Sequence, residues 1–239
     1  MLRRVDAEIL DDLAVDDPRA VASRRDLLRV HRVMQTRSIL VGVLRAWGRA
    51  AQAPLKMLEL GCGDGRLMLR TAAVLAPDWP PVELTLLDRQ PLLTDETIAS
   101  YADLGWTAMP LTADVLDCAR ERQGAGQSPR FDIVIANLFL HHFTEAPLQR
   151  ILGAVAGSTH RFLASEPRRS WLALAGSHVV GALGANAVTR QDAVVSVHAG
   201  FRALELSRLW PGDPSAWRLD EYPAGPFSHC FSAQRTGAT

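Results

Sequence analysis

Short apolar segments alternate with helical segments through most of the chain, and this alternation constrains the fold more than any other feature. The segments between the apolar runs carry apolar residues at three- and four-residue spacing, which is typical of helices. Strands that alternate with helices predict a parallel, doubly wound α/β sheet. Pro110 lies within the third run and favours an edge position for it, because proline cannot donate a ladder hydrogen bond. The five runs typical of strands span residues 56–60, 82–88, 106–114, 131–137 and 160–166.

The two ends of the chain add to this predicted sheet. Residues 1–50 show helical spacing and predict an N-terminal helical extension that serves as a lid, with residues 51–239 forming the main domain. Thr189, followed by Asp192 three residues later, predicts the start of a further helix. Two last apolar runs predict an antiparallel strand pair at the sheet edge, at residues 203–210 and 225–235.

The sequence LELGCGDGR, residues 58–66, lies between the first strand and the following helix. Its three glycines allow a sharp turn and a close approach of the backbone to a ligand. The start of the helix also offers unpaired N–H groups. The spacing is G-x-G-x-G, and Arg66 stands where a dinucleotide-binding turn has its third small residue. This loop therefore predicts a ligand site that differs from the usual dinucleotide site.

Acidic residues end the next two strands. Asp88 follows the second strand, where a carboxylate can accept both hydroxyls of a ribose. Asp114 follows the third strand, where a carboxylate can accept from an exocyclic amine, and Val115 can pack on a flat base. Because the carboxyl ends of parallel strands meet at one edge of the sheet, these groups predict a nucleoside site beside the glycine loop.

With these motifs in order, residues 55–165 resemble a class I S-adenosylmethionine-dependent methyltransferase. The matching segments are ELGCGDG, the acid Asp88, the pair Ala113-Asp114 and FDIVIANLFLHHF. The resemblance implies a Rossmann-like seven-stranded sheet with an antiparallel C-terminal strand pair. It implies a cofactor site for S-adenosylmethionine made of Arg37, Glu59, Gly61, Cys62, Gly63, Asp88, Arg89, Asp114, Val115, Asn137 and Leu138.

The N-terminal segment LRVHRVMQTRSILVGVLRA resembles a narrower group, small bacterial methyltransferases found beside type III polyketide synthases. In that group Arg37 would lie near the cofactor carboxylate, where a guanidinium fork suits it. The alternative interpretation places Arg37 on a solvated helix face.

His141 and His142 follow the fourth strand and are the candidate catalytic residues, with His142 the first choice. An imidazole has a suitable pKa to remove a proton from an oxygen acceptor near neutral pH. The alternative is that the pair packs at the start of the next helix. Asn137 stands where a metal-dependent enzyme of this kind would have an acid, so no metal is expected.

Residues 170–189 carry no formal charge and follow the fifth strand. Their polar residues and three glycines argue against a transmembrane helix, and the length suits either a wall of the acceptor site or an ordinary buried helix. We expect acceptor-binding residues here and at the end of the fifth strand, although an exposed charged loop is the alternative for the latter. The candidates are Glu166, Arg168, His178 and Asn186.

These observations predict a methyltransferase that acts on a small apolar or aromatic acceptor. Methylation is expected on oxygen, and a polyketide-derived phenol is one candidate acceptor. Methylation on carbon, an NAD(P)-dependent oxidoreductase and a non-catalytic cofactor-binding subunit are the alternatives. The chain has 26 basic and 26 acidic residues, which predicts no nucleic-acid partner. Three cysteines without metal-ligand spacing and the lack of an apolar leader predict a cytoplasmic protein. No stable membrane insertion is expected. The expected assembly is a homodimer or an association with a biosynthetic partner.

Overall fold

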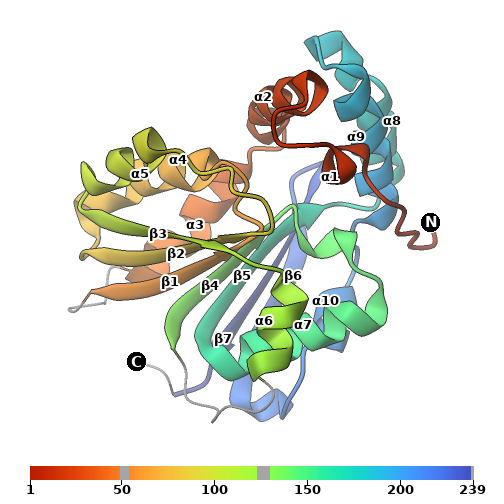
Figure 1. Cartoon of the computed structure of the whole chain (residues 1–239). Helices are drawn as coiled ribbons and strands as arrows, with labels where there is room; N and C mark the ends of the chain where they lie inside the picture. Colours follow the sequence, from red (N-terminus) through yellow and green to blue (C-terminus); the bar gives the residue numbers. More distant parts are fainter. Residues whose placement is uncertain (49–53, 123–129, 238–239) are drawn as a thin grey trace.

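The computed structural model describes residues 1–48, 54–122 and 130–237. Over these residues the chain forms one seven-stranded sheet, covered by helices on both faces and by further helices over one edge (Figure 1). The strand order is β3-β2-β1-β4-β5-β7-β6. The strands are β1 Leu55–Leu60, β2 Val82–Asp88, β3 Trp106–Thr112, β4 Phe131–Asn137, β5 Thr159–Pro167, β6 Trp217–Ala224 and β7 Ser228–Arg235.

The α-helices alternate with the first five strands and continue after them. They are α1 Ile9–Asp12, α2 Pro18–Val33, α3 Thr36–Gly48, α4 Arg66–Leu75, α5 Asp95–Ala102, α6 Val115–Arg122, α7 Glu145–Ser158, α8 Trp171–His178, α9 Ala187–Ala199 and α10 Glu205–Leu209. The short 3-10 helices are η1 Ala76–Asp78, η2 Leu140–His142, η3 Val180–Leu183 and η4 Pro214–Ala216.

The register of the parallel strands brings the functional residues to one edge. Leu60 of β1 pairs with Leu87 of β2 and with Ala136 of β4, so these three strands end side by side. β7 runs antiparallel to both β5 and β6. This arrangement confirms the predicted doubly wound sheet with its antiparallel C-terminal pair, and β3 is an edge strand as Pro110 indicates.

Alternate residues of the strands pack into two cores, one on each face of the sheet. Met57 belongs to the core under α3 and α4, together with Leu44 and Met68. Leu58 belongs to the opposite core, with Ile151 of α7 on the other side. Because side chains along a strand point alternately to the two faces, the nearly continuous apolar strands supply both cores.

Four helices cover the carboxyl edge of the sheet. α1 and α2 come from the N-terminus, α8 and α9 follow β5, and Figure 1 shows them together above the strand ends. α3 lies apart from this group, because its apolar face packs against α4 and β5. Two distant parts of the chain therefore enclose the space above the strand ends.

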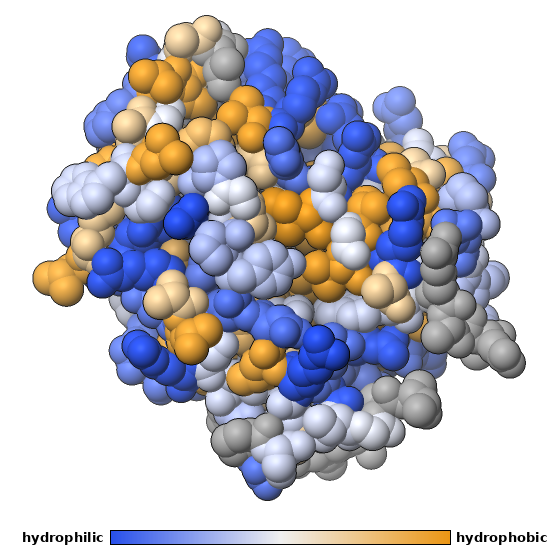
Figure 2. Space-filling view, turned by 180° about the vertical axis from the view of Figure 1, so that it is seen from behind, coloured by the Kyte–Doolittle hydropathy of each residue, from blue (hydrophilic) through white to orange (hydrophobic). Residues whose placement is uncertain are grey.

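The uncharged residues 170–189 form α8, η3 and the start of α9, with Gly184 in a left-handed turn between them. In the described part of the chain, every helix is too short or too polar to span a bilayer. On the face seen in Figure 2, apolar residues (orange) are interspersed with polar ones (blue). The uncharged stretch itself leaves Trp171, Leu172 and Val179 exposed, so only part of it faces inward.

Two predictions about the C-terminal part are wrong. The segment 203–210 contains α10, Glu205–Leu209, in place of a strand, and Leu206 of this helix and the C-cap residue Trp210 are buried. The carboxylate of Glu221 accepts the backbone N–H groups of Leu206 and Ser207 at 3.1 and 2.8 Å, which satisfies the first turn. The strand that pairs with β7 is β6, in a segment expected to be a connection.

The start of α9 also differs from the prediction. Asn186, and not Thr189, is the N-cap residue, because the Asn186 side chain accepts the backbone N–H of Thr189 at 2.9 Å. Asparagine is a strong N-cap, and its side-chain oxygen replaces an intrahelical acceptor. The helix therefore begins at Ala187.

Candidate active site

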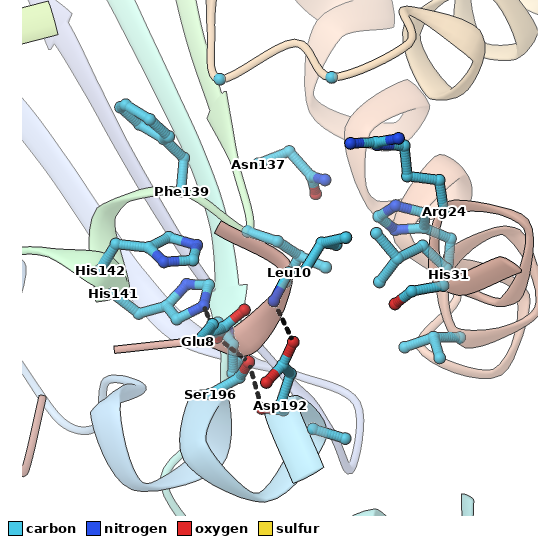
Figure 3. Close-up of a pocket in the computed structure, with 18 of the residues that line it drawn as sticks. Glu8, Leu10, Arg24, His31, Asn137, Phe139, His141, His142, Asp192 and Ser196 are labelled. Atoms are coloured by element: carbon cyan, nitrogen blue, oxygen red, sulfur yellow. Dashed lines mark hydrogen bonds and ion pairs between the residues drawn. The ribbon is translucent and has the colours of Figure 1, made fainter. Parts of the chain in front are cut away.

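A cavity of about 680 Å³ lies between the carboxyl ends of the strands and the four covering helices. Its floor comes from the loops after β1, β2, β3 and β4, and its walls come from α2, α8, α9 and the segment around α1 (Figure 3). The predicted crevice at the strand ends is thus the site that the structure forms.

The glycine loop after β1 has the backbone that its sequence indicates. Gly61 has φ +66°, and a Cβ there would lie 2.2 Å from the ring of Phe139. Gly63 has φ +55°, and a Cβ there would meet no atom within 4 Å. The backbone N–H of Gly63 donates to Asp88 at 2.9 Å, which ties the loop to the end of β2. Gly61 therefore allows close packing, and Gly63 exposes the backbone to the cavity.

Two buried polar groups border the cavity with an oxygen that has no hydrogen-bond partner among the described residues. They are Oε2 of Glu59, at the end of β1, and Oδ1 of Asn137, at the end of β4. Burial, then the neighbouring charges of Asp88 and Asp64, raise the pKa of Glu59 well above its usual value. A buried acceptor without a partner is costly, so both oxygens are suited to a donor or a cation from a ligand.

The two acids after β2 and β3 both border the cavity. The carboxylate of Asp88 accepts N–H groups from Gly63 and Gln90, each at 2.9 Å, and each of its oxygens keeps a free lone pair. Asp114 is exposed and accepts the N–H of Leu116 at 2.7 Å, while Val115 beside it is buried. The structure thus places all three predicted nucleoside-binding residues along one side of the cavity.

Three further predicted cofactor residues also line the cavity, namely Cys62, Arg89 and Leu138. Burial, then the charges of Glu59 and Asp88, raise the pKa of the Cys62 thiol, as expected of a small filler and not of a nucleophile. Leu138 has φ +48°, and its N–H donates to the carbonyl of Ser165 at 2.9 Å. The guanidinium of Arg89 donates to the backbone carbonyl of Asp11.

His141 is buried between two carboxylates. Its Nδ1 lies 2.8 Å from Glu166, and its Nε2 lies 3.2 Å from Glu8 (Figure 3). Burial alone would lower the pKa of His141, but the hydrogen bonds to Glu166 and then Glu8 outweigh it and raise the pKa to about 9. At neutral pH His141 is therefore an imidazolium, which has no lone pair with which to remove a proton.

His142 lies beside His141, with 4.3 Å between the ring centroids, and has a different environment. Its side chain is 22% exposed, and its Nδ1 lies 3.1 Å from the carboxylate of Asp11. When Nδ1 donates to that carboxylate, Nε2 carries the lone pair. Of the two predicted catalytic histidines, His142 is therefore the one whose surroundings suit a base.

Glu166, predicted to contact the acceptor, has another role. It lies fully buried outside the cavity lining and accepts the backbone N–H groups of Phe139, Leu140 and His141 at 3.0 to 3.3 Å. Together with its bond to the ring of His141, these bonds fix the turn that follows β4. Sequence reasoning placed Glu166 correctly at the strand end, but its side chain points into this turn.

Four other predicted site residues lie outside the cavity lining. Arg37 is exposed on α3, and His178 is exposed at the end of α8. Arg168 donates to the carbonyl of Gly225 at 3.2 Å. Asn186 caps α9 and donates from its side chain to the carbonyl of Arg19 at 3.0 Å. Arg37 was assigned from the resemblance, Arg168 because it follows the fifth strand, and His178 and Asn186 because they are polar residues in the uncharged stretch. Local hydrogen bonding or solvent accounts for each of them.

Sequence reasoning missed the N-terminal residues that border the cavity. Glu8 and Asp11 contact the histidine pair, and Asp192 of α9 holds the backbone of Ile9 and Leu10 at 2.9 and 3.0 Å. The available signal was the acid-rich composition of residues 6–17, which carry six acids before any base. Nothing local shows that these acids face histidines more than 120 residues away.

Glu8, His141 and His142 offer three ligand atoms within 4.8 Å of one another, a grouping that could hold a metal ion. Each histidine is already matched to a carboxylate, and the second nitrogen of His141 is matched to Glu166. The cluster is thus complete as a set of histidine–carboxylate pairs.

Residues 58–161 match the model of a family described as "Methyltransferase domain". No protein with a curated description matches the chain in sequence. A plantazolicin methyltransferase, solved in complex with a triazolic desmethylPZN analog and SAH, is similar in structure with a TM-score of 0.63 and 13% identity, over 92% of this chain and 91% of that one.

Two other solved structures are similar over less of their own length. An O-methyltransferase family protein from Burkholderia thailandensis has a TM-score of 0.55 and 18% identity, over 86% of this chain and 58% of that one. The mitomycin 7-O-methyltransferase has a TM-score of 0.56 and 20% identity, over 95% of this chain and 60% of that one. The chain thus spans less than two thirds of these two proteins, and the likeness shows the fold.

Proposed function

We propose that this chain, whose residues 58–161 match a methyltransferase domain, is a class I methyltransferase that uses S-adenosylmethionine and methylates a hydroxyl oxygen of a small apolar or aromatic acceptor. The observation that carries the proposal is the position of His142. This histidine, paired with Asp11, lies on the wall of a cavity whose remaining walls are largely apolar. An oxygen acceptor needs a base, and a small aromatic acceptor needs such walls.

The residues at the strand ends fit the cofactor. Its ammonium group would meet the unpartnered oxygens of Glu59 and Asn137, and its ribose hydroxyls would meet Asp88. Asp114 and Val115 would hold the adenine. When bound, S-adenosylmethionine supplies an electrophilic methyl group on a sulfonium leaving group. This fit depends on acidic and amide oxygens, which suits a ligand that carries positive charge.

The apolar part of the cavity lies on the side of the covering helices. Helices α2, α8 and α9, with η3 and the β6–β7 turn, bring aliphatic and aromatic groups together there. Such walls exclude water and hold a flat ring by burial, without a strongly directed bond. The residues are Leu27, Leu28, Val30, Ala173, Val179, Val180, Val197 and Phe227.

The proposed role of His142 is to take the hydroxyl proton of the acceptor onto Nε2. That oxygen would then be free to accept the methyl group, which S-adenosylmethionine would supply with its sulfur as the leaving group. Asp11 stabilises the imidazolium that results, because its carboxylate faces Nδ1–H. His141, already an imidazolium between Glu166 and Glu8, holds the adjoining turn in place.

Cofactor binding is tested by titration calorimetry with S-adenosylhomocysteine. We expect Asp88→Ala to weaken binding at least tenfold, because it removes the ribose acceptor and the anchor of Gly63. Glu83→Ala is the matched control, since Glu83 is an exposed acid on the same strand. Equal affinity of the two variants would reject this assignment.

The acceptor is tested with a panel of phenols and other hydroxylated ring compounds, using labelled S-adenosylmethionine and NMR of the products. We expect O-methyl products, and a loss of at least a hundredfold in kcat for His142→Gln. His178→Gln, an exposed histidine outside the cavity lining, should keep wild-type activity. Products methylated only on carbon or nitrogen would refute the acceptor class while leaving the cofactor site intact.

A further inference from the structure

The first 13 residues, called here the N-terminal strap, supply Glu8, Leu10 and Asp11 to the cavity lining and reach both histidines. The backbone N–H of Arg4 donates to His198 at 3.1 Å, and Arg169 donates to the carbonyl of Met1 at 3.2 Å. The N–H groups of Ile9 and Leu10 donate to the carboxylate of Asp192. The strap is thus fastened to α9 and to the end of β5 at several points.

Two of the four carboxylates of the strap, those of Glu8 and Asp11, face the two histidines one to one. Glu8 lies 3.2 Å from Nε2 of His141, and it also accepts from Ser196 of α9. Asp11 lies 3.1 Å from Nδ1 of His142. Figure 3 shows Glu8 between the histidine pair and α9, with Leu10 beside the cavity. The histidines belong to the sheet edge, and two of their three carboxylate partners belong to the strap.

The histidines depend on the strap to different degrees. His141 keeps Glu166 on its other nitrogen even without the strap, because Glu166 belongs to β5. For His142, Asp11 is the carboxylate that its ring faces within the described residues, so the strap determines which nitrogen carries the proton. The strap therefore sets the tautomer of His142, whose ring is partly exposed.

The strap is held mainly by these polar contacts. Its helix α1 has four residues and contains no fully buried side chain, and Leu2 is 92% exposed. A segment with little buried apolar area opens at a lower free-energy cost than the core. Glu8, Leu10 and Asp11 nevertheless line the cavity, so an opened strap would widen access to it.

We propose that the N-terminal strap closes over the acceptor and, in closing, completes the base, with Asp11 as the residue that positions His142. This proposal rests on the proposed function, because it assigns a partner to the base of that reaction. Opening admits the acceptor, and closing sets Nδ1–H of His142 on Asp11 and directs the Nε2 lone pair to the cavity. Asp192 has the separate role of docking the strap.

The test compares Asp11→Asn with Asp12→Asn. Asp12 is the exposed neighbour on the same short helix and is the matched control. We expect Asp11→Asn to lower kcat at least tenfold, with the Kd for S-adenosylhomocysteine within twofold of wild type. A kcat equal to that of Asp12→Asn, or a parallel loss of cofactor affinity, would overturn the proposal.

A second measurement does not need an acceptor. Long-range ¹H–¹⁵N spectra report the tautomer of His142, assigned with His142→Gln. We expect the Nδ1–H form in the wild type and in Asp12→Asn, and a mixed population in Asp11→Asn. An unchanged signal in Asp11→Asn overturns the proposal even if no hydroxyl is methylated, and a changed signal without methylation refutes only the proposed acceptor.

Asp192→Asn tests the docking of the strap without touching the histidines. We expect faster amide hydrogen exchange at Ile9 and Leu10, together with a lower kcat, because both N–H groups lose a charged acceptor. Unchanged exchange and unchanged kcat would contradict a closing strap. Stoichiometric Zn²⁺ binding that His142→Gln abolishes would identify the cluster as a metal site and would also overturn the proposal.

Discussion

Glu166→Gln is the substitution that most directly tests how the turn after β4 is held. The variant keeps the size of the side chain and removes its charge. In the wild type, Glu166 accepts three backbone N–H groups and lies 2.8 Å from His141 Nδ1, with no exposure of its side chain. A glutamine amide would turn N–H groups toward some of these donors and leave His141 with one carboxylate.

The expected cost follows from the ion pair. Breaking a buried charge pair by removing one partner costs about 3–5 kcal/mol of the free energy of unfolding. The pairing of His141, whose pKa rises from 6.5 to about 9 on folding, accounts for about 3 kcal/mol at 1.36 kcal/mol per pKa unit. Because the folded-state pKa is raised, this stability is fully present below pH 6.5 and is lost as the pH rises through 9.

Urea denaturation at pH 7 and at pH 10 measures this cost. We expect Glu166→Gln to lose about 3–5 kcal/mol at pH 7 and clearly less at pH 10, where His141 is neutral in both proteins. Glu221→Gln is the matched control, because Glu221 is equally buried and lies 2.8 Å from His229, away from the cavity. Only Glu166→Gln should also weaken S-adenosylhomocysteine binding. A loss below about 1 kcal/mol at pH 7, or one that does not shrink with pH, would refute the reasoning.

Three further substitutions test other parts of the site. Glu59→Gln should leave the free energy of unfolding unchanged or raised, because it removes a buried carboxyl without a full set of partners, and should weaken S-adenosylhomocysteine binding at least tenfold in calorimetry. Gly63→Ala and its control Gly105→Ala should each cost about 1–2 kcal/mol in denaturant unfolding for their positive φ, but only Gly63→Ala should lower ligand affinity, because its Cβ would enter the cavity. Asn186→Ala should lower thermal stability by about 1 kcal/mol as a lost N-cap, with the KM for the acceptor unchanged; a raised KM would restore Asn186 as an acceptor-binding residue.

The sheet could be predicted from the sequence because its signals are local. Each of the five parallel strands is a short apolar run. The three glycines of the loop after β1 all adopt a positive φ, which other residues rarely do. The edge position of β3 followed from a single proline. The misassigned strand at 203–210 shows the limit of this method, because a short apolar run suits a helix or a strand and its partner, Glu221, lies on β6.

The position of the predicted cofactor residues beside the cavity also follows from the sequence, for a related reason. In a parallel sheet, the ends of neighbouring strands meet at one edge, so a residue's position on its strand already gives its place in space. Asp88 and Asp114 were found in this way, whereas Glu59 and Asn137 were assigned from the resemblance, and all four border the cavity. The rule gives the position of the backbone and not the direction of the side chain, which is why Glu166 was assigned to the acceptor.

The sequence by itself determined the order of the strands along the chain, the glycine loop and the pair of histidines at the sheet edge. The tertiary structure alone distinguished the two histidines, one closed between carboxylates and the other open to the cavity. That difference comes from Glu8 and Asp11, which are more than 120 residues away along the chain. A charge acts on a histidine through distance in space, and only the folded chain brings these carboxylates within 3.2 Å.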